Sequence, residues 1–172
     1  MNNASPMKAR VPGVPGAVNG MLLWMAQAAC MAAPLFLRVA LALPFFKSGL
    51  TKWDGFLSLS PAVSFLFQEE FKLHIFGKTY DLPAPDVLAL VSGSVEIIFP
   101  ILLILGLATR FSALGLLGMT AVIQLIVPDG WANFHLPWAT MAIALIALGP
   151  GRLSLDEWIR GYLDPGQTST SI

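Results

Sequence analysis

The chain has 172 residues, of which 56% are hydrophobic and only 12% are charged. Soluble domains carry about 25% charged residues, so this composition, with several apolar runs of about 20 residues, predicts a polytopic membrane protein. The formal net charge is zero and no basic stripe is present, which excludes nucleic acid as a partner. A single cysteine excludes an internal disulfide, and two isolated histidines, His74 and His135, are too few for a metal site.

The N-terminal segment is expected to lie outside the membrane bundle. Residues 1–20 are rich in Pro and Gly, and residues 21–33 (MLLWMAQAACMAA) form an apolar run that is short for a span. We interpret this run as an interfacial helix leading into the first span. The alternative is a cleaved secretory segment, but Gln27 stands where a lipoprotein cleavage box requires an aliphatic residue. The predicted domains are therefore a tail with its interfacial helix (1–33), a membrane domain (34–158) and a C-terminal helix end with its tail (159–172).

Four apolar runs predict four membrane-crossing helices, and the fold class is all-α, a four-helix transmembrane bundle. The spans are expected at about 34–53, 86–107, 111–127 and 137–150. The long loop after the first span contains SPAVSFLFQEEFKL, in which Ser60 can cap a helix and Pro61 stands at its first position. We expect this outer-loop helix to lie on the membrane face. Residues 152–163 (RLSLDEWIRGYL) predict a C-terminal amphipathic helix, which Ser154 can cap.

The basic residues predict the orientation of the four spans. With four spans, every arginine falls at the end of the bundle that carries the two termini and the 108–110 link. Arginine and lysine are enriched in cytoplasmic loops, so both termini are expected to be cytoplasmic.

An acidic residue near the middle of the second span is the main functional signal. A charge at that depth costs roughly 2.5–3.5 kcal/mol on insertion scales, so Glu96 requires a partner or a proton. Arg38 and Lys52 fall within about 40° of each other on a helical wheel and share their stripe with Gly49, where another backbone can approach closely. Lys47 is also within reach of Glu96, but it points to the opposite face. We therefore predict an Arg38–Glu96 contact.

Three interpretations of Glu96 remain open at this stage. The residue can form an ion pair that only fixes helix register, it can belong to a proton or head-group site, or it can be protonated and hydrogen-bonded. Arg38 and Lys52 can instead extend to the two membrane interfaces. His135 suits proton relay at a membrane surface or, alternatively, capping of the next helix, and Gln124 is expected to form an interhelical hydrogen bond.

Catalysis by this chain alone is not expected. No nucleophile–base pair, glycine-rich phosphate loop or zinc-protease pattern occurs in the sequence. The sequence also shows no ligand set for haem or an iron–sulfur cluster, so electrons for a redox reaction would have to come from a partner protein.

Several segments, taken in order, resemble the DoxX family of small bacterial membrane proteins. The resemblance covers residues 34–158 and includes Arg38, Glu96 and the motif positions Ser48, Gly49, Trp53, Arg110 and Asp156. The segments that carry it are FFKSGLTKW (45–53), ILLILGLATR (101–110), SALGLLGMTAVIQ (112–124), HLPW (135–138) and GPGRLSLD (149–156). Where relatives continue quickly into the second span, this chain inserts FKLHIFGKTYDLPAPD (71–86).

The resemblance implies a multi-pass protein of the bacterial inner membrane, and members of the family are associated with redox settings, including quinone-linked oxidoreductases. Our first hypothesis is a membrane component of a redox or stress-response system, in which Arg38, Lys52, Glu96 and His135 hold a quinone-like head group or relay a proton. This first hypothesis requires a redox partner protein, and it is compatible with a homodimer. The second hypothesis is a non-catalytic scaffold that docks partner proteins. A small-solute transporter is a weaker third idea, because four spans are few and no inverted repeat is evident.

Overall fold

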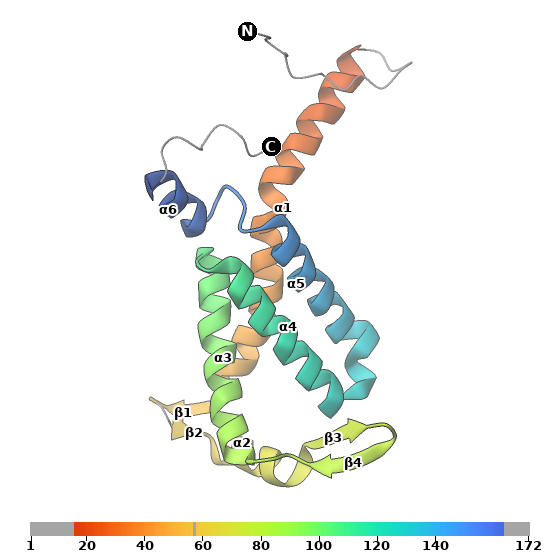
Figure 1. Ribbon diagram of the computed structural model, residues 1–172, viewed down its shortest axis with the longest axis vertical. Coiled ribbons are helices and arrows are strands. Elements are labelled where there is room, and N and C mark those ends of the chain that lie inside the picture. Colours follow the sequence, from red (N-terminus) through yellow and green to blue (C-terminus); the bar gives the residue numbers. More distant parts are fainter. Residues whose placement is uncertain (1–15, 57, 164–172) are drawn as a thin grey trace.

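The structure, a computed structural model, describes residues 16–56 and 58–163 and is predominantly helical. Four segments are long and apolar enough to cross a membrane. Three are the helices α1 (Gly16–Leu50), α3 (Pro85–Leu105) and α4 (Thr109–Ile126). The fourth is the segment Pro128–Leu148, which ends in α5 (Leu136–Leu148). Figure 1 shows these segments gathered into one bundle, which confirms the predicted all-α class with four spans.

Helix α1 runs without interruption through the segment that was expected to be a separate interfacial helix. Residues 21–33 form its first half, and at 1.5 Å per residue the 35-residue helix is about 52 Å long. The segment contains no Gly or Pro that would end a helix, and Pro34 and Pro44 are accommodated inside α1. The buried residues of α1 nevertheless begin at Pro34, where the membrane domain was predicted to start. Residues 1–15 of the predicted N-terminal tail and 164–172 of the predicted C-terminal segment lie outside the described residues.

The core of the bundle is formed by alanine and leucine side chains from all four spans, together with Phe45. Helix α1 packs mainly on α3, while α5 packs on α4 and α1. A tight link joins α3 to α4 in antiparallel fashion, with Gly106 and Ala108 in the left-handed region at φ 69° and 47°. The buried core consists of Leu41, Ala42, Phe45, Leu103, Ala113, Leu116, Ala142 and Leu145.

The long loop between α1 and α3 folds over one end of the bundle, which we call the loop end. Its helical part is α2 (Pro61–Phe65) followed by the π-helix η1 (Leu66–Glu70), with Pro61 at the first helical position as predicted. The helix stops at Glu70 because Phe71 adopts an extended conformation, with φ −76° and ψ 121°. The loop also contains four short strands that were not predicted: β1 (Trp53–Gly55), β2 (Ser58–Leu59), β3 (Lys72–Ile75) and β4 (Lys78–Asp81).

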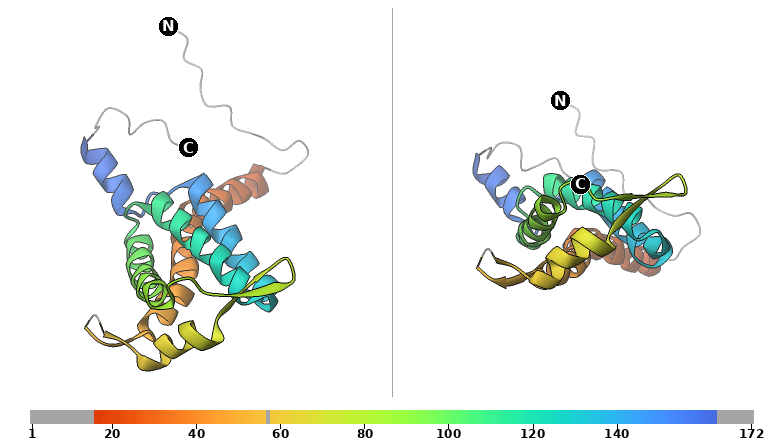
Figure 2. Two further views of the ribbon diagram at one scale, coloured as in Figure 1. Left: turned by 60° about the horizontal axis from the view of Figure 1, so that its bottom comes forward. Right: turned by 90° about the horizontal axis from the view of Figure 1, so that it is seen from below.

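The two strand pairs are antiparallel hairpins, β1 with β2 and β3 with β4. The second hairpin is built by the insert at 71–86, and β3 packs against α4. Figure 2 shows this hairpin crossing the loop end of the bundle beside α4. A small core of Val63, Phe67, Leu82 and Ala89 attaches the loop to α3.

The C-terminal amphipathic helix is α6 (Leu155–Leu163), at the opposite end of the bundle from the hairpins (Figure 1). The backbone N–H of Glu157 donates to Ser154 Oγ at 3.2 Å, which is the predicted cap. No residue of α6 is buried. Two short turns precede α5: the 3-10 helix η2 (Pro128–Gly130) and the π-helix η3 (Trp131–His135).

A glycine-to-alanine exchange at the contact between α1 and α3 should destabilise the fold. A Cβ at Gly49 would lie 2.9 Å from the backbone carbon and oxygen of Glu96, so Gly49→Ala requires the two helices to separate. We expect a loss of about 1–3 kcal/mol of unfolding free energy. Gly118→Ala is the matched control, because a Cβ at this helical position meets nothing within 4 Å. Thermal unfolding in detergent tests the pair, and equal stability of the two variants would contradict the packing described.

Candidate functional site

Glu96 is paired with Lys52 and not, as the sequence suggested, with Arg38. Glu96 is 3% exposed, and its Oε2 lies 2.5 Å from Lys52 Nζ. Lys52 follows the end of α1 in a turn, where its backbone N–H donates to Gly49 O at 3.0 Å and its side chain returns toward α3. The Arg38–Glu96 prediction is wrong because Gly49 is the residue that touches the Glu96 backbone. Arg38 lies eleven residues before Gly49, which places it roughly 16 Å nearer the N-terminus of α1.

Arg38 serves the opposite end of the bundle. It is fully buried, Nη2 donates to the carbonyl of Leu153, and the guanidinium lies against Gly106, where a Cβ would overlap it. Its Nε and Nη1 have no hydrogen-bond partner among the described residues. Asp156 accepts hydrogen bonds from the backbone N–H groups of Ala108 and Thr109, at 2.7 and 2.9 Å. Arg38 and Asp156 thus attach the C-terminal segment to the start of α4, away from Glu96.

Of the other motif residues, three lie beside the Lys52–Glu96 pair and one lies at the opposite end of the bundle. Ser48 Oγ accepts a hydrogen bond from Lys52 Nζ at 3.0 Å. Trp53 Nε1 donates to Gly93 O at 3.4 Å, and its indole fills the space where Gly93 has no side chain. Ser48, Gly49 and Trp53 therefore surround the Lys52–Glu96 pair. Arg110 is exposed and lies beside Gly149, at the end that carries Asp156.

His135 belongs to a separate polar contact between α4 and the start of α5. The ring is buried, and Nδ1 lies 2.5 Å from Gln124 Oε1, while Gln124 Nε2 donates to Pro128 O at 3.1 Å. Gln124 therefore makes the predicted interhelical hydrogen bond. The suggestion that His135 caps the next helix is wrong, because its side chain makes no cap hydrogen bond.

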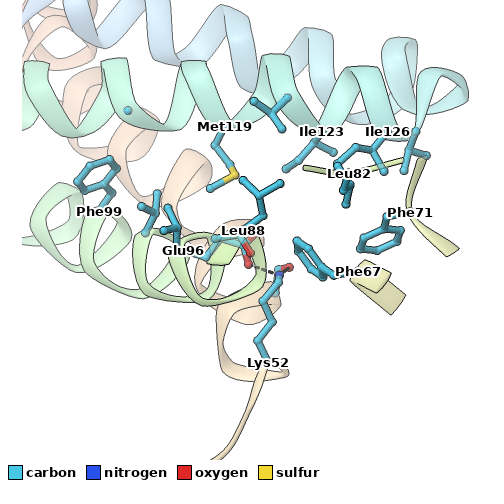
Figure 3. Close-up of a pocket in the computed structure, with 17 residues that line it drawn as sticks. Lys52, Phe67, Phe71, Leu82, Leu88, Glu96, Phe99, Met119, Ile123 and Ile126 are labelled. Atoms are coloured by element: carbon cyan, nitrogen blue, oxygen red, sulfur yellow. Dashed lines mark hydrogen bonds and ion pairs between the residues drawn. The ribbon is translucent and has the colours of Figure 1, made fainter. Parts of the chain in front are cut away.

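A cavity of about 380 Å³ lies between α3 and α4 at the loop end, next to the ion pair (Figure 3). Figure 3 shows Phe99 at one end of it and Phe71 with Leu82 at the other. Most of its wall is aliphatic or aromatic. The polar side chains in the wall are those of Ser48, Lys52, Ser92 and Glu96. No local pattern in the sequence predicts this cavity, because its walls come from the end of α1 with the turn after it, η1, the hairpin insert, α3 and α4.

The polar corner of the cavity retains hydrogen-bond donors. An ammonium group has three N–H donors, and Lys52 uses one on Glu96 and one on Ser48. The third has no partner among the described residues. The hydroxyl of Ser48 accepts from Lys52 and keeps its own proton, which has no acceptor within residues 16–56 and 58–163. This corner can therefore donate two hydrogen bonds to an acceptor in the cavity.

Comparison with known proteins places the chain in a family. A family model described as DoxX matches residues 33–129, which is more than half of the chain. This chain belongs to the DoxX family. It is also 34% identical over 144 residues to a Haemophilus influenzae protein that carries the name "Uncharacterized protein", with 73% of this chain and 82% of that relative covered. No solved structure matches the chain.

A double-mutant cycle should reveal the strength of the ion pair. Both charged groups are largely buried, with side-chain exposures of 11% for Lys52 and 4% for Glu96. Lys52→Met leaves a buried carboxylate without its base, and we expect a loss of about 3–5 kcal/mol. In the double variant Lys52→Met/Glu96→Gln the loss should fall well below the sum of the two single losses.

The matched control is Lys47→Met, which removes an exposed lysine of α1 and should change little. Unfolding free energies in detergent provide the measurement. Single losses that add to within about 0.5 kcal/mol would show that the two groups do not interact.

Proposed function

We propose that this DoxX protein is a membrane component of a redox or stress-response system and holds a quinone-like ligand in the cavity between α3 and α4. One observation carries the proposal: a buried ion pair, Lys52–Glu96, supplies the charged groups in the wall of an otherwise largely apolar cavity. Cavities that bind small molecules are typically about 300–1,000 Å³, mostly apolar, with a few placed polar groups. The cavity described here has this character.

The ring of a quinone matches the two kinds of surface in the cavity. Its carbonyl oxygens are acceptors, and the free donors of Lys52 and Ser48 lie at the polar corner. Its flat apolar ring suits contact with aromatic side chains, of which Phe67, Phe71 and Phe99 line the wall. The proposed pose therefore places one carbonyl at Lys52 and the ring among these phenylalanines.

Proton exchange is the second part of the proposed role. A quinone takes up protons together with electrons, and Glu96 is the carboxylate in the cavity wall. His135 does not line the cavity, so the proposal locates proton exchange at the Lys52–Glu96 pair. Among the described residues no group of three His, Cys, Asp or Glu side chains could hold a metal ion. In this proposal a redox partner protein supplies the electrons.

Quinone content of the purified protein tests this role. We expect quinone to be retained through purification, and Glu96→Gln and Lys52→Met to lower the retained amount at least about tenfold, which corresponds to about 1.4 kcal/mol. Lys47→Gln, which changes an exposed lysine near the end of α1, should retain the wild-type amount. Mass spectrometry of organic extracts measures the content. Wild-type quinone content in Glu96→Gln would contradict the proposal.

A scaffold role is the second candidate, and the exposed helix α6 favours it. Trp158 and Tyr162 are 71% and 79% exposed and stack on each other, with ring centroids 6.5 Å apart. In that role the Lys52–Glu96 pair would only fix the packing of α1 on α3. Replacing Trp158 and Tyr162 with serine should then abolish capture of partner proteins, while Glu96→Gln should leave capture intact. The opposite pattern would favour the ligand-binding role.

We also propose that the end of the bundle with α6 is cytoplasmic, in a bacterial inner membrane. Arg110, Arg152 and Arg160 lie at that end, whereas the loop end carries lysines among several acidic residues. A reporter fused to the C-terminus provides the test: green fluorescent protein should fluoresce and alkaline phosphatase should be inactive. Active phosphatase at the C-terminus would show the reverse orientation.

A further inference from the structure

We infer that the cavity between α3 and α4 is filled sideways from the bilayer, through an opening between Val91 and Val122. The ligand would then be a membrane-resident amphiphile, with its polar head at Lys52 and its apolar tail leaving the protein into lipid. This inference rests on the proposed function only in assuming that the cavity holds a ligand.

Three sides of the cavity are closed by protein. Behind it lie the end of α1, which contributes Ser48, and the turn after α1, which contributes Lys52. At the end away from the hairpins Phe99 lies directly against Gly115, so closely that a Cβ at Gly115 would overlap the ring. At the loop end Phe67, Phe71 and Leu82 extend over it (Figure 3).

The segments that carry Phe67, Phe71 and Leu82 form a cover over the loop end of the cavity. Hydrogen bonds attach this cover to both helices that flank the cavity, α3 and α4. His74 Nδ1, on β3, lies 3.2 Å from the carbonyl oxygen of Leu125 on α4. Gln68 Nε2, on η1, donates to Asp86 Oδ1 at the start of α3 at 2.7 Å. The π-helix η1 and the insert at 71–86 thus close the cavity together at the loop end.

The fourth side is open and apolar. Val91 on α3 and Val122 on α4 both line the cavity, yet they are 49% and 44% exposed. Their exposed neighbours are also apolar, as Leu90 and Leu125 illustrate. Glu96 is the one charged residue of α3 after its first turn, and its side chain points to Lys52. In a membrane-spanning bundle an opening framed by such residues faces lipid.

The geometry defines the class of ligand. Its head must offer hydrogen-bond acceptors to Lys52 and Ser48 at the closed back of the cavity. Its tail must be apolar, and its length is not limited by the protein, because the tail passes between the two valines into the bilayer. An isoprenoid quinone has both features, whereas a water-soluble solute would have to pass the fastened cover.

The first experiment locates the rim without using any ligand. Val91→Cys and Val122→Cys, each with Cys30→Ser, carry a nitroxide label in lipid nanodiscs, and electron paramagnetic resonance measures collisions with oxygen and with a water-soluble nickel complex. We expect the labels at Val91 and Val122 to collide often with oxygen and rarely with the nickel complex. The control Ile98→Cys, at an exposed apolar position of α3, should show the same pattern. The pattern of Lys78→Cys, an exposed residue on the hairpin, would overturn the inference.

The second experiment tests the route with ubiquinone-10 dissolved in the nanodisc bilayer. Val91→Trp/Val122→Trp narrows the opening and should lower bound ubiquinone-10 at least about tenfold, while Ile98→Trp, on the same helix outside the cavity, should have no effect. Undiminished binding in the double variant, with wild-type stability, would overturn the lateral route. If the wild-type protein binds no ubiquinone-10, the proposed function fails, and the spin-label result alone decides where the cavity opens.

Discussion

The buried ion pair between Lys52 and Glu96 is the constraint on which the arrangement around the cavity depends. A carboxylate inside an apolar span is costly, and the cost is offset only if a base reaches it. The base comes from the turn after α1, which requires the end of α1 to meet the middle of α3. Gly49 permits this contact because a side chain there would collide with the Glu96 backbone. Trp53 then packs on Gly93, one turn of α3 nearer the loop end.

The two buried bases of the first span have different roles. Arg38 is enclosed by protein and holds the C-terminal segment through the carbonyl of Leu153. Lys52 is partly exposed to a cavity and keeps donors that the described protein groups do not use. The Nε and Nη1 atoms of Arg38 also lack a hydrogen-bond partner among the described residues, but Arg38 does not line the cavity, whereas Lys52 does. The proposed ligand therefore belongs to the loop end of the bundle, away from Arg38.

Much of the fold follows from patterns that the sequence contains. The four spans are defined by apolar length, the start of α2 by Pro61, and the cap of α6 by Ser154. The sequence also predicts that Glu96 has a partner, because an unpaired charge inside a long apolar span is costly. The special role of Gly49 could be anticipated from its position on the stripe of α1 that faces α3.

The choice of partner and the cavity could not be predicted, for specific reasons. A helical wheel treats Lys52 as part of α1, but the helix ends at Leu50 and a turn redirects the lysine. The register that separates Arg38 from Glu96 is fixed by the contact at Gly49, which is a property of two helices together. The cavity is assembled from five separate elements, including the hairpin insert, and no local pattern indicates that Phe71 and Leu82 cover it.

Carbon-13 NMR of the Glu96 carboxyl group tests the central claim most directly. The chain has four glutamates, so labelling at glutamate Cδ and comparison with Glu96→Gln would assign this resonance. The account predicts that Lys52→Met shifts the Glu96 resonance strongly, that Arg38→Met leaves it nearly unchanged, and that ubiquinone-1 shifts it in the wild-type protein. A resonance that responds to Arg38→Met and not to Lys52→Met would contradict the account.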